Sequence, residues 1–257
     1  MEVEQEILRR TRYVFGRTDW DRRIAVTLAP GAEYFHVDEV IRPGFYGLEW
    51  AAGMWAEGEN RATGHRAVPV FFTTSSPSIY KGFETIIDTA RVLVGNGVAF
   101  EWRVAGLKAD DPLVRLTLAE RRVDELAGLN IRLMGILSEE AVGDQLLGSD
   151  AYIQVSHIEN SPNSVCEAML AGVPVIASFV GGTGSLLQDG IHGVLVQDGD
   201  PYALAGAMRE VLERPEKHAA MAAEARRLAQ RRHDPASIVR SMLERYREII
   251  QKNTIHE

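Results

Sequence analysis

The chain has 257 residues, 46% hydrophobic and 25% charged, which is a globular composition with enough apolar mass for a sizeable core. A net charge of −8 disfavours a nucleic-acid partner, and a single cysteine, Cys166, excludes an internal disulfide framework. No apolar run approaches the roughly 18 residues of a membrane span, and the acidic start is unlike a signal peptide. We therefore expect a cytoplasmic protein, for which peripheral contact with the inner face of a membrane stays open.

The first 57 residues offer one strand-like piece, a turn, and a helix whose start carries a capping box of Thr18 and Asp21. These elements are too few to bury a core of their own. We interpret residues 1–60 as the tail of a preceding N-terminal domain together with an interdomain linker. The polar stretch 58–64 is the predicted boundary.

From about residue 68, strand patterns alternate with helical ones. Six stretches rich in β-branched and aromatic residues predict strands: 68–75, 99–106, 131–137, 151–156, 173–179 and 193–199. Helical spacing, caps and prolines predict helices at 80–94, 111–128, 138–149, 161–171, 201–213, 215–232 and 236–252. The fold class is therefore α/β, a doubly wound, Rossmann-like domain with a six-stranded parallel sheet over 61–215. Extra C-terminal helices occupy 216–257.

In such sheets, ligands bind at the carboxyl ends of the strands. After the fourth predicted strand, Ser161 is a good N-cap and Pro162 fits the first helical position. The helix that follows would aim free N–H groups and a positive dipole end into the crevice, which suits a phosphate. Glu159 precedes this helix start and Glu167 lies over a turn beyond it, where carboxylates can accept hydrogen bonds from sugar and ribose hydroxyls. An arbitrary pair of acids is more often solvated, so the residues around this pair decide between the readings.

Those residues resemble the C-terminal, donor-binding domain of retaining glycosyltransferases with the GT-B fold, the class called glycosyl transferases group 1. The resemblance rests on Glu159 and Glu167 with seven residues between them, then Ala-Met, the run Gly-Val-Pro-Val-Ile-Ala-Ser at 172–178, and Gly181-Gly182. It implies the donor-binding half of an enzyme that transfers a sugar, with retention, from a nucleotide-diphosphate sugar to an acceptor hydroxyl in glycan or glycolipid synthesis. It implies no cofactor and no metal.

The resemblance also implies roles for individual residues. Lys81 would contact the donor diphosphate and Glu159 the transferred sugar, so these two are the candidate catalytic residues. Glu167 would bind the ribose. The remaining candidates for the sugar-nucleotide site are Gly82, Asn163, Ser164, Gly181, Gly182, Gly135, Ile136 and Leu137.

Simpler interpretations of these candidates stay open. Lys81 could be a solvated side chain, and Asn163 and Ser164 could merely cap a helix. Gly181-Gly182 could be an ordinary strand-to-helix turn, and a loop of small and apolar residues at 135–137 fits any turn. His157 could approach the sugar or pack at the strand end.

Two positions depart from the family pattern. Many relatives carry an arginine where this chain has Ser76, and the lost charge-assisted contact is typically worth about 1.5–3 kcal/mol. Many also carry an acid where this chain has Ser185. The family places the acceptor on an N-terminal domain toward which the C-terminal helices pack back, so we expect this fragment to bind nucleotide with little turnover alone. The alternatives are a non-catalytic nucleotide-sugar-binding module, which Ser76 favours, and a sugar-nucleotide epimerase.

Overall fold

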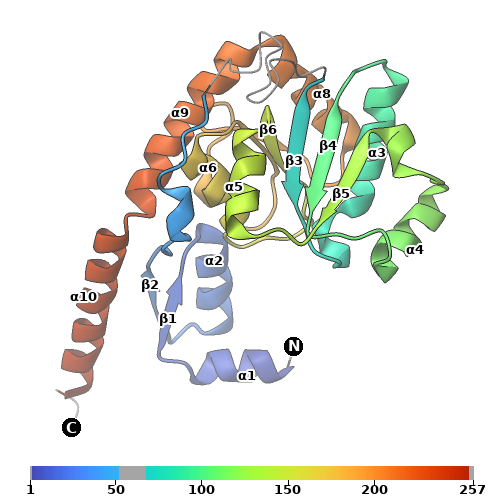
Figure 1. The fold of residues 1–257 in the computed structure, drawn as a ribbon. Helices are drawn as coiled ribbons and strands as arrows, with labels where there is room; N and C mark the ends of the chain where they lie inside the picture. The colour runs from blue at the N-terminus through green and yellow to red at the C-terminus, as the bar shows by residue number, and fades with distance from the viewer. Residues whose placement is uncertain (1, 52–67, 255–257) are drawn as a thin grey trace.

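A six-stranded parallel sheet organises the protein in the computed structural model, which describes residues 2–51 and 68–254 (Figure 1). Its strands are β3 (Val70–Thr74), β4 (Glu101–Ala105), β5 (Ile131–Gly135), β6 (Ala151–Gln154), β7 (Val175–Ser178) and β8 (Val194–Val196). All five strand pairs are parallel, and the spatial order is β5-β4-β3-β6-β7-β8. The predicted fold class is confirmed, whereas the predicted boundary at 58–64 lies outside the described residues.

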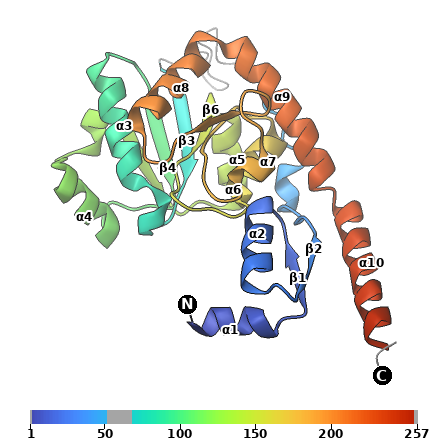
Figure 2. The ribbon, with the colours of Figure 1, turned by 180° about the vertical axis from the view of Figure 1, so that it is seen from behind.

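Helices cover both faces of the sheet (Figures 1 and 2). One layer contains α3 (Phe83–Gly95), α4 (Pro112–Arg121) and α8 (Pro201–Glu213). The other contains the short helix η1 (Pro43–Phe45), α5 (Glu139–Leu147), α6 (Asn163–Ala171) and α9 (Pro215–Arg232). Neighbouring strand residues point to opposite layers, so Phe71 belongs to the first core and Phe72 to the second. Three short helices complete the unit: η2 (Ile79–Lys81), η3 (Leu126–Leu129) and α7 (Thr183–Leu186).

The strand order reverses between β3 and β6, which pair although they are far apart in the sequence. Chain connections from β3 run to one side of the sheet and connections from β6 to the other. Open α/β sheets bind ligands at such a reversal, in the crevice at the carboxyl ends of the strands. The sequence predicts the ligand in this crevice between β3 and β6.

The N-terminal segment differs from expectation. It contains α1 (Glu2–Arg10), β1 (Tyr13–Gly16), α2 (Asp19–Leu28) and β2 (Glu33–His36), and β1 pairs with β2 in parallel. We expected one strand-like piece, and the structure has two joined by a helix. Each strand has only four residues, too few to show a clear alternation of polar and apolar side chains. The capping box is confirmed, with Thr18 Oγ accepting from the Asp21 backbone N–H at 3.1 Å.

The last helix, α10 (Pro235–Thr254), leaves the six-stranded unit and lies beside β1 and β2 (Figure 1). The rings of Phe15 and Tyr246 pack with centroids 5.5 Å apart. Lys252 Nζ lies 2.5 Å from a carboxylate oxygen of Glu33. The C-terminal end of the chain therefore packs on the small N-terminal sheet. None of the described helices has the length and hydropathy that crossing a membrane requires.

Three helix boundaries were wrong. The helix expected over 80–94 begins at Phe83, because Gly82 adopts a left-handed backbone and separates it from η2. The helix expected over 111–128 ends at Arg121, because Arg122 adopts a left-handed backbone with φ 52° and closes it before η3 begins. The helix expected to be capped by Ser161 begins at Asn163, with Pro162 as its N-cap. The Ser161 hydroxyl instead donates to Glu39 Oε1 at 2.9 Å. The side chain that was expected to cap the helix therefore binds a carboxylate of the N-terminal segment.

Gly106, directly after β4, is required by a close backbone approach. Its φ is 91°, and a Cβ atom there would lie 1.9 Å from the carbonyl oxygen of Ser75. Gly106→Ala should therefore destabilise the protein by about 1–3 kcal/mol or more, because the left-handed backbone strains an alanine and its Cβ atom clashes with the Ser75 carbonyl oxygen. Gly206→Ala, in the exposed part of α8 with nothing near the new methyl group, should be neutral or stabilising by up to about 1 kcal/mol. Urea unfolding of both variants checks this, and equal stabilities would contradict it.

Candidate functional site

Lys81 and Glu159 meet at the point where the strand order reverses. Lys81 ends η2 on the β3 side, and Glu159 lies in the loop after β6. Lys81 Nζ lies 2.5 Å from Glu159 Oε1, with side-chain exposures of 25% and 15%. The two candidate catalytic residues, separated by 78 positions in the sequence, therefore form one half-buried ion pair.

Gly82 explains how Lys81 reaches that loop. It adopts a left-handed backbone with φ 68° between η2 and α3, and a Cβ atom there would lie 2.0 Å from the Val155 carbonyl oxygen. Only glycine allows the turn to lie directly against the end of β6. The His157 backbone N–H, in turn, donates to the Tyr80 carbonyl at 2.8 Å. These backbone contacts fix Lys81 beside the loop that carries Glu159.

Glu167 lies on α6 and is almost fully buried, with 5% of its side chain exposed. Its Oε1 accepts from Arg42 Nε at 2.8 Å. Burial raises the pKa of Glu167, and the hydrogen bond and charge of Arg42 oppose that rise. Sequence reasoning missed Arg42 because it lies 125 positions away in a segment with no recognisable motif.

A cavity of about 370 Å³ opens beside Glu167 at the carboxyl ends of β3 and β4. It brings together five predicted residues: Ile136, Leu137, Asn163, Ser164 and Glu167. Its other lining residues are Arg42, Thr74, Ser75, Ala105, Gly106 and Val142. Two residues of the loop at 135–137 and Glu167, the predicted ribose ligand, therefore line one cavity, whereas Lys81 and Glu159 do not line it.

Gly181 and Gly182 pack against the loop that carries Glu159. Cβ atoms at these positions would lie 1.9 Å from the Glu159 carbonyl oxygen and 2.0 Å from that of Asn160. The Gly182 N–H also donates to the Glu159 carbonyl at 2.9 Å. Close packing of two loops therefore accounts for this glycine pair, and its contact with a donor stays a prediction.

Glu39 of the N-terminal segment binds side chains at the start of α6. In the amide orientation that pairs donors with acceptors, the Asn163 nitrogen lies 2.9 and 3.1 Å from the two Glu39 oxygens. Glu39 also accepts from Ser161 and pairs with Arg17. The side chains of Ser161 and Asn163 thus hold the N-terminal segment. The predicted contact between the N–H groups of this helix start and a phosphate stays a prediction.

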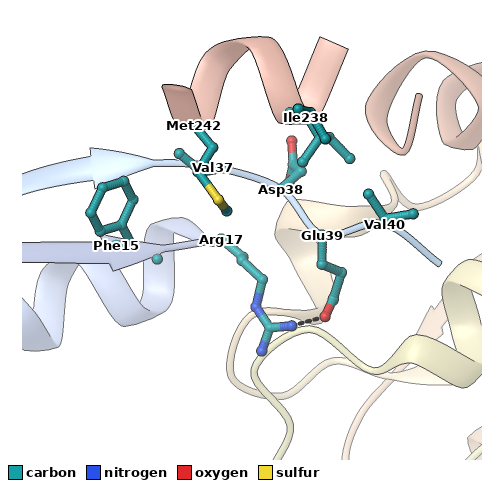
Figure 3. A pocket seen from close by; sticks show the side chains of 10 residues that line it. Phe15, Arg17, Val37, Asp38, Glu39, Val40, Ile238 and Met242 are labelled. Atoms are coloured by element: carbon teal, nitrogen blue, oxygen red, sulfur yellow. Dashed lines mark hydrogen bonds and ion pairs between the residues drawn. The ribbon is translucent and has the colours of Figure 1, made fainter. Parts of the chain in front are cut away.

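A second hollow, of about 460 Å³, lies between the ends of β1 and β2 and the helix α10 (Figure 3). Arg17 and Glu39 pair at one side of it, and the rest of the lining consists of Asp38 and of apolar side chains from β1, the segment after β2 and α10. None of the predicted site residues lines this hollow. It is a feature of the N-terminal unit, separate from the crevice between β3 and β6.

The two departures from the family pattern have visible surroundings. Ser185 accepts from the Asp19 backbone N–H through its hydroxyl at 3.1 Å and from Arg232 through its carbonyl at 2.5 Å. Its position therefore faces the N-terminal segment. The Ser76 carbonyl accepts from the Ser78 N–H at 2.7 Å in the turn after β3. The described residues contain no group of three or more His, Cys, Asp or Glu side chains placed to hold a metal ion, and metal-free chemistry stays a prediction.

His157 lies between two carboxylates at the same edge of the sheet. Its Nδ1 is 2.7 Å from Asp198 Oδ1, and its Nε2 contacts Glu84. Burial alone would lower the pKa of His157, but the hydrogen bonds and charges of Asp198 and Glu84 outweigh burial and raise it. Carboxylates only accept, so both ring nitrogens donate when the imidazole is protonated. Protonated His157 thus joins α3, the loop of Glu159 and the loop before α8.

This arrangement predicts a pH-dependent contribution to stability. Because the folded-state pKa of His157 is raised, the contribution is fully present below the unfolded value of about 6.5 and is lost as pH rises through the folded pKa. His157→Gln should remove that part of the dependence and lower stability more at pH 5.5 than at pH 9. Urea unfolding across this range, compared with wild type, measures it. A pH-independent difference between the two proteins would contradict the prediction.

Comparison with known proteins identifies the class. The arrangement of a six-stranded parallel sheet with C-terminal helices matches glycosyltransferases of the GT-B fold. The family described as Glycosyl transferases group 1 matches residues 64–228. This match covers more than half of the chain, and the protein belongs to that family.

Individual relatives are more distant. A D-inositol 3-phosphate glycosyltransferase of Geodermatophilus obscurus is 34% identical over 131 residues, which cover 44% of this chain and 29% of that protein. A putative colanic acid biosynthesis glycosyltransferase, WcaL, of Salmonella typhimurium is 27% identical over 136 residues, covering 51% and 32%. The matched region thus spans about a third of these relatives.

Among solved structures, a sucrose-phosphate synthase of Thermosynechococcus elongatus is similar with a TM-score of 0.80 at 18% identity, over 98% of this chain and 61% of that one. Anabaena HepE in complex with UDP-glucose is similar with a TM-score of 0.76 at 18% identity, over 96% and 67%. At these identities the likeness establishes the fold.

Proposed function

We propose that the crevice between β3 and β6 binds a nucleotide-diphosphate sugar and serves as the donor site of a retaining glycosyltransferase. The observation that carries this proposal is the placement of two acids and one lysine around the start of α6. Lys81 pairs with Glu159 on one flank, and Glu167 lines the cavity on the other. Family membership supports the same assignment.

Each element would supply a distinct interaction. The first N–H groups of α6 lack intrahelical partners and carry the positive end of the helix dipole, which suits a diphosphate. Lys81 would add a full positive charge as negative charge develops on the leaving diphosphate. Glu167 would accept the ribose hydroxyls beside a base flanked by 135–137. Glu159 would contact the sugar that is transferred.

The relatives support the chemistry of donor and product. Anabaena HepE has been solved with UDP, with UDP and glucose, and with UDP-glucose. Relatives of this chain include proteins named for colanic acid and amylovoran biosynthesis, the latter from Erwinia amylovora. We therefore propose a nucleoside diphosphate sugar, with UDP as the first probe, and an acceptor hydroxyl on a glycan or glycolipid.

Changing Glu167→Ala should weaken nucleoside diphosphate binding strongly. Wild type with UDP, GDP or ADP at about 100 times its Kd should be stabilised by about 2.7 kcal/mol. The variant should lose most of this ligand-induced stabilisation, because a carboxylate bridging two ribose hydroxyls has gone. Thermal unfolding with and without each nucleotide measures the effect. Glu213→Ala, which removes an exposed carboxylate on α8, is the matched control, and equal ligand responses in both variants would remove Glu167 from the site.

Lys81→Ala should discriminate between the diphosphate and the nucleoside. Loss of one charge-assisted contact, about 1.5–3 kcal/mol, predicts a fall in UDP affinity of about 10- to 150-fold. Uridine, which has no phosphate, should bind the variant and wild type about equally. Isothermal titration calorimetry with both ligands gives the comparison. A parallel loss for uridine would mean that the lysine acts through folding and not through the phosphates.

Ser76 favours a second candidate, a module that binds sugar nucleotides without transferring sugar. Both candidates require donor binding, so transfer distinguishes them. We propose that transfer needs acceptor-binding residues beyond this chain, since the relatives are longer than the region they share with it. The chain alone should then bind UDP with little turnover of UDP-glucose. Rapid transfer by the chain alone would contradict this, and absence of transfer when acceptor-domain residues are supplied would favour the binding module.

A further inference from the structure

Among the described residues of the N-terminal segment, 2–51, only Arg42 lines the cavity. It precedes η1, whose Phe45 is fully buried against the layer formed by α5 and α6. The backbone N–H of Gly44 donates to Glu139 Oε1 at 3.1 Å at the start of α5. The Arg42 guanidinium also lies over the Phe45 ring, 4.7 Å from its centroid. The backbone and the side-chain stem of Arg42 are therefore anchored before it reaches the cavity.

The guanidinium of Arg42 pairs with the buried carboxylate of Glu167. Glu167 is held away from water on α6, where an ionised carboxylate is costly without a partner. Arg42 Nε donates to Oε1 at 2.8 Å, and 45% of the arginine side chain is exposed. A carboxylate has about four lone-pair sites, and one bond to Nε leaves acceptor capacity for two hydroxyls. The contact with Arg42 thus favours the ionised form of Glu167 and fixes one of its oxygens, while the carboxylate can still accept further hydrogen bonds.

We propose that Arg42 is a positioning residue for donor recognition: it keeps Glu167 ionised and oriented so that the carboxylate accepts the ribose hydroxyls. This inference rests on the proposed function, and it adds a contribution from a residue that precedes the first strand of the six-stranded sheet in the sequence. The ribose contact of the donor site then depends on a residue of the N-terminal segment. Nucleotide recognition is shared between two parts of the chain.

A different role for Arg42 predicts a different pattern of binding. An arginine that contacted the diphosphate directly, in place of the cation missing at Ser76, would favour ribose and deoxyribose nucleotides equally. An arginine that only stabilised the fold would leave both affinities unchanged in the folded variant. Dependence on the ribose 2′-hydroxyl separates the positioning role from both.

The experiment measures Kd for UDP and 2′-deoxy-UDP, with GDP and 2′-deoxy-GDP as a second pair, by calorimetry. Wild type should prefer each ribonucleotide over its deoxy counterpart. Arg42→Met should weaken UDP binding about tenfold or more, with a much smaller change for 2′-deoxy-UDP, so that the preference collapses. Arg42→Lys should restore part of the preference, because it keeps the charge but loses the planar donor geometry.

Arg226→Met is the matched control. Arg226 also pairs with a glutamate of the N-terminal segment, Glu49, at 3.3 Å, but it does not line the cavity. Both nucleotide affinities should stay at wild-type values in this variant. Thermal unfolding of each variant without ligand confirms that it is folded, and Arg42→Lys keeps the test decisive if Arg42→Met does not fold.

Three outcomes would overturn the proposal. An equal fall for UDP and 2′-deoxy-UDP in Arg42→Met assigns the arginine to the phosphates, and unchanged affinities assign it to structure alone. In both cases wild type still binds nucleotide and the proposed function stands. Failure of wild type to bind any of the four nucleotides would instead overturn the proposed function, and the role of Arg42 with it.

Discussion

The parallel pairing of β3 with β6 is the constraint on which the site depends. Phe71 and Phe72 of β3 pair with Ala151 and Tyr152 of β6, across nearly 80 residues of intervening chain. Because the two strands run in the same direction, both release their loops at one edge of the sheet. Lys81 and Glu159 meet for this reason, and the start of α6 lies beside them. The sheet topology thus determines which side chains meet at this edge.

Glycines convert this topology into precise loop contacts. Gly82 lies against the end of β6, Gly106 against the loop after β3, and Gly181-Gly182 against the loop of Glu159. In each case the missing Cβ lets one backbone approach the carbonyl oxygen of another. A site made of loops gains rigidity in this way, since its parts are held by main-chain packing as well as by ion pairs. His157 adds contacts with Glu84 and Asp198, which link the loop of Glu159 to α3 and to the loop before α8.

The sequence was informative wherever local pattern and family motif coincided. The strands from Val70 onward alternate with amphipathic helices, so the sheet and its layers could be predicted from periodicity. Lys81, Glu159 and Glu167 could be named as candidates because they stand in the family motif, Lys81 and Glu159 in segments that follow strands and Glu167 on α6. Arg42 and Glu39 could not, because their roles arise from the docking of the N-terminal segment on α6 and no local pattern records that contact. The prediction of Ser161 as N-cap was wrong for the same reason, because its hydroxyl donates to Glu39.

The path of the last two helices has a mechanical consequence. Helix α9 packs on α6 within the α/β unit, whereas α10 packs on β1 and β2. The chain therefore passes between the two bodies at His233 and again near Glu39, and these crossings touch, since His233 Nδ1 lies 2.8 Å from the Glu39 carbonyl oxygen. The Tyr46 hydroxyl also donates to the His233 carbonyl at 2.6 Å. Two crossings side by side define a single axis, so a swing of one body against the other would pivot there, while Arg42, anchored through η1 to the α/β unit, would stay with the nucleotide pocket.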